Sequence, residues 1–88
     1  MPEQQIGSVV HYFGGPSVAV VKVAAGELAI GDKIRFLGHT TDLTEVVTSM
    51  EVDHKKVERA HVGDEVAVQV VSRVRHHDKV LKVEESAP

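Results

Sequence analysis

Apolar and polar residues alternate over much of this chain, and the alternation predicts β-strands rather than helices. Residues 17–24 are apolar at nearly every position, which is typical of a central strand covered on both faces. Residues 66–74 carry the clearest set of inward positions, namely Val66, Val68, Val70 and Val74. We therefore expect an all-β protein whose core is built largely from valine.

The same pattern predicts strands over residues 6–13, 43–53 and 79–83. Between the first two strands of the chain, Gly14-Gly15-Pro16 predicts a turn, because glycine tolerates unusual backbone angles and proline donates no hydrogen bond. Residues 55–60 fit a short strand, a loop or a single helical turn equally well.

A short motif occurs twice, in residues 30–36 and 62–68, with the pattern apolar-Gly-Asp-charged-apolar-x-apolar. In both copies the glycine can take a positive φ, and the aspartate can cap a turn through its own side chain. Each copy therefore predicts a turn that leads into a strand. This turn chemistry accounts for Asp32 and Asp64 without a ligand.

About six strands joined by turns must protect the edges of their sheet, and closing into a small barrel is one way to do so. We expect a closed six-stranded Greek-key barrel over residues 6–83, with flexible ends at 1–5 and 84–88. An open meander or a two-sheet sandwich stays open as an alternative. A barrel of this size is filled by side chains, so no internal ligand cavity is expected.

Composition narrows the class of protein. The chain has 88 residues, of which 42% are hydrophobic and 3% aromatic, and it has no cysteine. Disulfides, thiolate nucleophiles and zinc sites with sulfur ligands are therefore excluded. No stretch has the length or the flanks of a membrane span or a secretory signal, so we expect a cytoplasmic protein. Phosphate-binding loops are missing, and we expect neither a cofactor nor a nucleotide bound by this chain alone.

The net charge is −3, so contact with nucleic acid would need a local basic patch. Two runs of the sequence offer one, and Tyr12 is the aromatic residue best placed for stacking on a base. The candidates for nucleic-acid binding are Lys55, Lys56 and Arg59 in the first run, Arg73, Arg75, His76 and Lys79 in the second, and Tyr12. Acidic residues are interleaved with both runs, so a solvated surface of mixed charge is the alternative.

Catalysis and metal binding have weaker signals. Adjacent His76 and His77 would either point to opposite faces of a strand or sit in a turn, and neither arrangement offers a chelating pair. A site built across strands from His39, Asp53 and His54 is a further hypothesis. The serines lack the spacing of a catalytic triad, and we expect no catalytic residue and no resident metal.

The order of these segments resembles the second domain of elongation factor Tu, the β-barrel of translational GTPases. The resemblance lies in residues 6–10, 17–23 and 26–34, the last reading Gly-x-Leu-x-x-Gly-Asp-x-Ile, and in the second Gly-Asp turn at 60–66. Residues 38–55 are more similar to free-standing elongation-factor-like barrels. They also resemble the C-terminal barrels of collagenase-like peptidase family proteins, some of which act in tRNA modification.

This resemblance implies a closed six-stranded Greek-key barrel whose work is contact rather than chemistry. The GTPase motifs of translation factors lie in another domain and have no counterpart here. Expected partners are tRNA, the ribosome, or a protein of translation or RNA modification. A protein-protein adaptor with no RNA contact is the alternative, and the sequence makes no prediction about oligomeric state.

Overall fold

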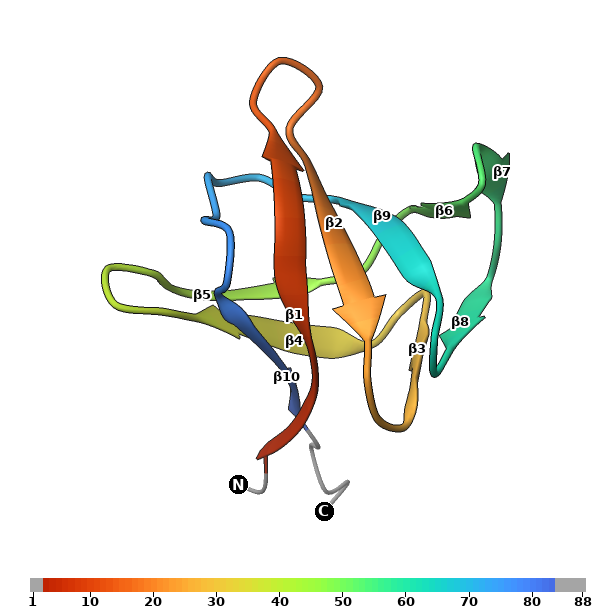
Figure 1. The fold of residues 1–88 in the computed structure, drawn as a ribbon, viewed down its shortest axis with the longest axis horizontal. Helices are drawn as coiled ribbons and strands as arrows, with labels where there is room; N and C mark the ends of the chain where they lie inside the picture. The colour runs from red at the N-terminus through yellow and green to blue at the C-terminus, as the bar shows by residue number, and fades with distance from the viewer. Residues whose placement is uncertain (1–2, 84–88) are drawn as a thin grey trace.

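The computed structural model describes residues 3–83, and this range is all-β, as predicted (Figure 1). It contains no helix long and apolar enough to cross a membrane. Ten strands are present within it, where about six were expected. They are β1 (Glu3–Phe13), β2 (Val18–Val23), β3 (Glu27–Ala29), β4 (Lys33–Leu37), β5 (Asp42–Val46), β6 (Met50–Val52), β7 (Lys55–Lys56), β8 (Arg59–His61), β9 (Glu65–Gln69) and β10 (Lys79–Val83).

Eight of these strands form one antiparallel sheet in the order β5-β4-β10-β1-β2-β9-β6-β7, and β3 pairs with β8 in a separate small sheet. β2 lies between β1 and β9, which confirms its predicted central position. Only one of its faces is in the core, however, because Ala19, Val21 and Val23 are buried whereas Val18 and Val20 are partly exposed. β1 begins at Glu3 rather than at the predicted Ile6.

The core lies between β1 and β2 on one side and β4, which runs across them in Figure 1, on the other. All four predicted inward valines of residues 66–74 are buried in it, and Phe36 is fully buried. The buried apolar residues are Ile6, Val9, Ala19, Val21, Val23, Leu28, Ile34, Phe36, Val47, Met50, Ala60, Val66, Val68, Val70, Val74 and Val80. Valine is the commonest of them, as the small number of aromatic residues predicted.

The predicted closed barrel is not what the strand pairing shows. Among the described residues the large sheet ends at β5 and β7, and these strands do not pair with each other. The gap beside β5 is bridged by a side chain, because the carboxylate of Glu45 accepts a 3.0 Å hydrogen bond from the backbone N–H of Val71.

The long strand predicted over residues 43–53 is two strands, β5 and β6. The chain leaves the ladder at Val47, whose N–H donates to the Asp32 carbonyl and whose carbonyl accepts from the Gly31 N–H. Val47 is therefore buried, while the neighbouring Val46 is 52% exposed. The break shifts the alternation by one residue and carries the chain from β4 to β9.

The structure decides among the three alternatives for residues 55–60, which were a short strand, a loop or a helical turn. Asp53 and His54 both have positive φ, and Val52 pairs with Lys55, so a two-residue turn of type I′ geometry joins β6 to β7. After two residues of β7 the chain turns again and forms β8. A helical turn, one of the three alternatives, is not formed.

The two Gly-Asp turns are confirmed. Gly31 and Gly63 have φ of 94° and 95°, the value that the third residue of a type II turn requires. Each aspartate caps its turn, with Asp32 accepting from the Ala29 N–H at 2.8 Å and Asp64 from the His61 N–H at 2.9 Å. The first turn leads into β4 and the second into β9.

A third copy of this turn precedes β10, where the sequence has no glycine. Asp78 accepts a hydrogen bond from the Arg75 N–H at 2.8 Å, and its own N–H donates to the Arg75 carbonyl. His77 occupies the glycine position with a φ of 75°. A histidine there carries backbone strain, because a side chain disfavours this left-handed region.

Each of the three turns docks on one buried valine. In every case the N–H of the third turn residue donates to the valine carbonyl, and the valine N–H donates to the carbonyl of the turn aspartate. The three pairs are Gly31 with Val47, Gly63 with Val23, and His77 with Val9, and all six bonds are 2.8 or 2.9 Å long. The described residues thus contain three equivalent turns. The third turn lies beside the candidate site described below.

The expected flexible tail at 84–88 and the first two residues of the expected flexible N-terminus lie outside the described residues.

Candidate nucleic-acid interface

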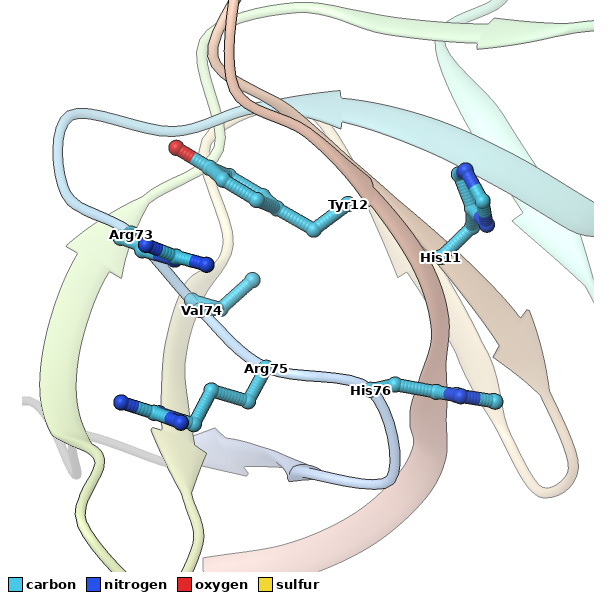
Figure 2. Close-up of a pocket in the computed structure, with 6 residues that line it drawn as sticks. All are labelled: His11, Tyr12, Arg73, Val74, Arg75 and His76. Atoms are coloured by element: carbon cyan, nitrogen blue, oxygen red, sulfur yellow. The ribbon is translucent and has the colours of Figure 1, made fainter.

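A hollow of about 510 Å³ lies between the C-terminal end of β1 and residues 73–76, which lead into the third turn (Figure 2). No carboxylate of residues 3–83 lines it. The lining residues are His11, Tyr12, Arg73, Val74, Arg75 and His76. Four of them, Tyr12, Arg73, Arg75 and His76, were candidates from the sequence, and the fold brings them together although Tyr12 is far from the others along the chain.

Backbone bonds at both ends hold the segment that carries the two arginines. Near its start, Val70 donates to the Ser17 carbonyl and Val71 to the Glu45 carboxylate. At its end, the third turn docks on Val9. Between these points the Val74 side chain is buried, while Arg73 and Arg75, one residue to either side, are exposed.

A β-bulge in β1 sets the direction of the Tyr12 side chain. The pairing of β1 with β2 shifts between Val9 and His11, so one extra residue reverses the alternation that follows. Tyr12 consequently packs partly against the core, and His11 is exposed with its ring 4.4 Å from that of Phe13. In Figure 2 the Tyr12 ring lies beside Arg73, at the edge of the hollow.

The arginines of the hollow differ from the other two of the chain. Arg35 donates to Asp42 at 2.7 and 2.8 Å and to Glu3, and Arg59 donates to Glu27 at 3.0 Å. Arg73 and Arg75, in contrast, form no ion pair with any residue of the described range. Their charge is therefore available to an anion from outside the chain.

Two smaller hollows continue this surface. One, of about 400 Å³, is lined by Arg73 and Arg75 together with Ser72 and residues 40–43. Its one carboxylate is Asp42, whose charge is offset by Arg35, and the hydrogen bonds from Arg35 lower the pKa of Asp42. The other, of about 380 Å³, brings Lys79 beside His39 and His77. We call the surface formed by Tyr12, Arg73, Arg75, His76, His77 and Lys79 the basic edge.

The first basic run lies elsewhere. Lys55 and Lys56 form β7, at the opposite end of the sheet from β5, and Figure 1 shows β7 far from residues 70–78. Arg59 is paired with Glu27. The hollow beside β6 is lined by Glu51, Asp53 and Glu65, which oppose the approach of an anion. The two runs therefore do not form one surface, and a role for the first one stays a prediction.

The histidines do not assemble a metal site. His39 lines a hollow with His77, whereas Asp53 and His54 line a different one. Within residues 3–83 no three side chains of the types His, Cys, Asp and Glu lie close enough together to hold an ion. The rings of His76 and His77 stack face to face, with centroids 3.9 Å apart and planes 13° from parallel.

His11 and Val74 are parts of the hollow that the sequence did not single out. The burial of Val74 was predicted, and its position between two arginines is the signal that could have placed both of them at the surface. His11 had no such signal, because its direction depends on the bulge.

Comparison with known proteins finds relatives among peptidases. The chain is 40% identical over 83 residues, or 93% of its length, to an uncharacterized protease of Methanocaldococcus jannaschii, and covers 20% of that protein. It is 32% identical over 78 residues to a collagenase of Porphyromonas gingivalis, and covers 22% of it. The chain thus spans about a fifth of the length of these relatives. No family model matches the sequence.

Among solved structures, the fold is similar to the C-terminal domain of a Geobacillus thermoleovorans U32 peptidase. The TM-score is 0.84 at 19% identity, over 92% of this chain and 93% of that one. A selenomethionine variant of the same domain gives a TM-score of 0.79 over 91% of this chain. The relatives are therefore proteases and collagenases, and the structural neighbour is a peptidase's C-terminal domain. The resemblance to collagenase-like peptidase proteins is thereby supported, whereas the one to elongation factor Tu stays a prediction.

Proposed function

We propose that this chain is a non-catalytic binding module that contacts RNA through the basic edge. The observation that carries the proposal is the pair Arg73 and Arg75, which have no ion pair within the described range and share a carboxylate-free hollow with Tyr12. Guanidinium groups bind phosphate through two parallel hydrogen bonds, and an aromatic ring can stack on a base. The relatives' longer chains are consistent with a module that serves a larger protein.

In this proposal the arginines hold the phosphate backbone and Tyr12 contacts an unstacked base. Recognition would be weakly selective for sequence, because phosphate contacts carry no base information. The RNA would be a tRNA or rRNA, in keeping with the predicted link to translation or RNA modification. The chain contributes no catalytic group and binds no nucleotide or cofactor of its own, and it acts in the cytoplasm. We also propose that the strands are connected as a Greek key.

The test is an NMR titration of the nitrogen-15-labelled protein with tRNA at low and then moderate salt. We expect salt-sensitive amide shifts confined to residues 73–79 and Tyr12. Replacing Arg73 and Arg75 together by alanine should reduce the slope of log affinity against log salt by about 1 to 2, since each phosphate contact contributes about 0.9. Arg59→Ala is the matched control, because it removes a distant arginine.

Absence of shifts up to high micromolar tRNA would overturn the RNA proposal. So would a loss in the double variant that is only about twice the loss in the Arg59→Ala control, because each arginine would then act only through overall charge.

The second candidate function, a protein-protein adaptor, has its own observation. The outer face of β1, β2 and β9 carries a partly exposed apolar row, formed by Phe13, Val18, Val20 and Ala67. An adaptor would use this row and be indifferent to the arginines. Retained binding of a partner protein by the Arg73/Arg75 double variant, without tRNA-induced shifts, would favour it.

A further inference from the structure

The two ends of the large sheet differ in how far they are protected against pairing with another chain. A free edge strand exposes unpaired backbone groups, and proteins commonly shorten such strands or place lysines on them. β7 has both protections, because it is two residues long and both are lysine. β5 has neither, since it is five residues long and contains no lysine or proline.

The backbone phase of β5 follows from two hydrogen bonds that flank it. Gly38 donates to the Thr41 carbonyl at 2.7 Å, and Val47 donates to the Asp32 carbonyl at 2.9 Å. Bonded pairs alternate along an antiparallel ladder, so Leu43 and Glu45 direct their N–H and C=O groups to β4. The backbone groups of Asp42, Thr44 and Val46 then point to the free edge.

Those three residues are all exposed. Their backbone groups take part in none of the loop hydrogen bonds of the described residues, and the hydrogen bond from Val71 across the gap is accepted by the Glu45 side chain. Six hydrogen-bonding groups, three N–H and three C=O, are therefore presented along one line. This is the arrangement that an added strand uses.

The hollow beside this edge indicates the charge of the added strand. It has a volume of about 400 Å³ and is lined by residues 40–43, Ser72, Arg73 and Arg75. Its only carboxylate, Asp42, is held by Arg35. A side chain that enters the hollow from a strand on β5 thus meets two guanidinium groups without ion pairs in the described range, and an acidic side chain complements them.

We propose that β5 is an acceptor edge for an extended segment of a partner protein, which pairs with Asp42, Thr44 and Val46 and places an acidic side chain against Arg73 and Arg75. This goes beyond RNA contact and does not depend on it, because the backbone edge carries the pairing. The two functions share the arginines, so bound peptide and bound RNA should compete.

Hydrogen exchange of the free protein tests the edge itself. The amides of Asp42, Thr44 and Val46 should exchange at least tenfold faster than those of Leu43 and Glu45. Equal protection of all five amides would overturn the proposal, because the edge would then already be paired.

Binding is tested with a synthetic peptide of sequence Thr-Val-Glu-Val-Glu-Val-Thr, blocked at both ends. We expect NMR shifts and slowed exchange at Asp42, Thr44 and Val46. Two matched controls carry N-methyl groups on alternate amides in opposite phases, and only one of them should lose binding, since a strand pairs through one edge. A peptide with lysine in place of glutamate should bind at least tenfold more weakly.

Thr44→Pro is the protein variant of choice, because it removes one edge N–H that β4 does not use. It should keep the fold and abolish peptide shifts, while tRNA-induced shifts at Arg73 and Arg75 persist. The proposal is overturned if no peptide shifts occur at millimolar concentration, if both N-methylated peptides still bind, or if the lysine peptide binds equally well. If Thr44→Pro fails to fold because proline restricts φ, the two N-methylated peptides and the hydrogen exchange of the unmodified protein decide the proposal.

Discussion

The strained third turn gives the sharpest quantitative prediction. Gly31, Gly63 and His77 occupy equivalent positions, with φ of 94°, 95° and 75°. No atom lies within 4 Å of a Cβ built on Gly31 or Gly63, so alanine there changes backbone energetics without a clash. Gly63→Ala adds a Cβ at this position of the second turn. The difference between His77→Ala and His77→Gly removes a Cβ at the same position of the third turn, so the two comparisons measure the same change in opposite directions.

The magnitude follows from two opposing terms. A side chain in the left-handed region costs about 1 to 2 kcal/mol. Replacing glycine by alanine restricts the unfolded chain and returns about 0.4 to 1 kcal/mol. Gly63→Ala should thus lower the free energy of unfolding by about 1 kcal/mol. The free energy of unfolding of His77→Gly should be higher than that of His77→Ala by the same amount. Both His77 variants lose the ring contact with His76 at 3.9 Å, so that loss cancels between them.

Urea and thermal unfolding followed by circular dichroism would measure these differences. For a domain of this size, 1 kcal/mol corresponds to a shift of about 4 to 8 °C in Tm. Gly31→Ala provides a second estimate of the same quantity at another turn. If His77→Gly is no more stable than His77→Ala while Gly63→Ala is destabilised, the third turn is not strained and the threefold equivalence of the turns is refuted.

Three further predictions concern stability. Val68→Ala should lower the free energy of unfolding by about 1 to 3 kcal/mol in urea titrations, through the cavity it leaves at a buried position; a change of a few tenths would contradict its placement. Glu45→Ala should cost about 0.5 to 1.5 kcal/mol, because it removes the hydrogen bond from the exposed Val71 N–H, whereas Glu45→Gln keeps an acceptor and relieves a buried carboxylate oxygen that has no partner; equal unfolding midpoints for the two variants would contradict the bridging role. The hydrogen bonds from Arg35 lower the pKa of Asp42, so the stabilisation by this ion pair is present above about pH 4 and is lost as the pH falls through the lowered pKa. The free energy of unfolding of Asp42→Asn should therefore fall less below about pH 4 than that of the unmodified protein. An identical fall in both proteins would argue against the ion pair.

Alternation alone was sufficient to predict the parts of the fold that lie on regular strands. Val66 and Val68 lie on β9 and could be identified because a strand repeats every two residues, whereas the equally buried Val70 and Val74 lie beyond the end of that strand. The Gly-Asp turns were predictable for a similar reason, since glycine marks the position that needs positive φ. Local rules of this kind hold wherever the backbone is unstrained.

The misplaced elements are those in which tertiary contacts override local pattern. At Val47 the chain leaves its ladder to bond the first turn, and the inward positions shift from Leu43, Glu45 and Val47 to Met50. At Asp53 and His54 two residues other than glycine adopt positive φ, so the hairpin lacked its usual sequence signal. The absence of closure was equally hidden, because it depends on which strands meet at the gap beside β5.

For the candidate site, the sequence identified residue types but not their grouping. Lys55 and Arg73 belong to equally basic runs, yet only Arg73 stands where the fold removes competing carboxylates. The difference arises from partners distant in sequence: Arg59 pairs with Glu27, 32 residues away. Tyr12 joins the arginines because a bulge in β1 redirects it, and no pattern of apolar and polar residues encodes a bulge.

The three turns differ in the residues at their second and third positions. In two copies the exposed second and third residues are apolar and glycine, namely Ile30-Gly31 and Val62-Gly63. In the third copy both are histidine, and the third residue keeps the left-handed backbone in spite of its side chain. Locally unfavourable residues persist where something other than stability retains them, and functional sites are the commonest such places. The strained His77 lies on the basic edge, as part of the turn that follows Arg73 and Arg75.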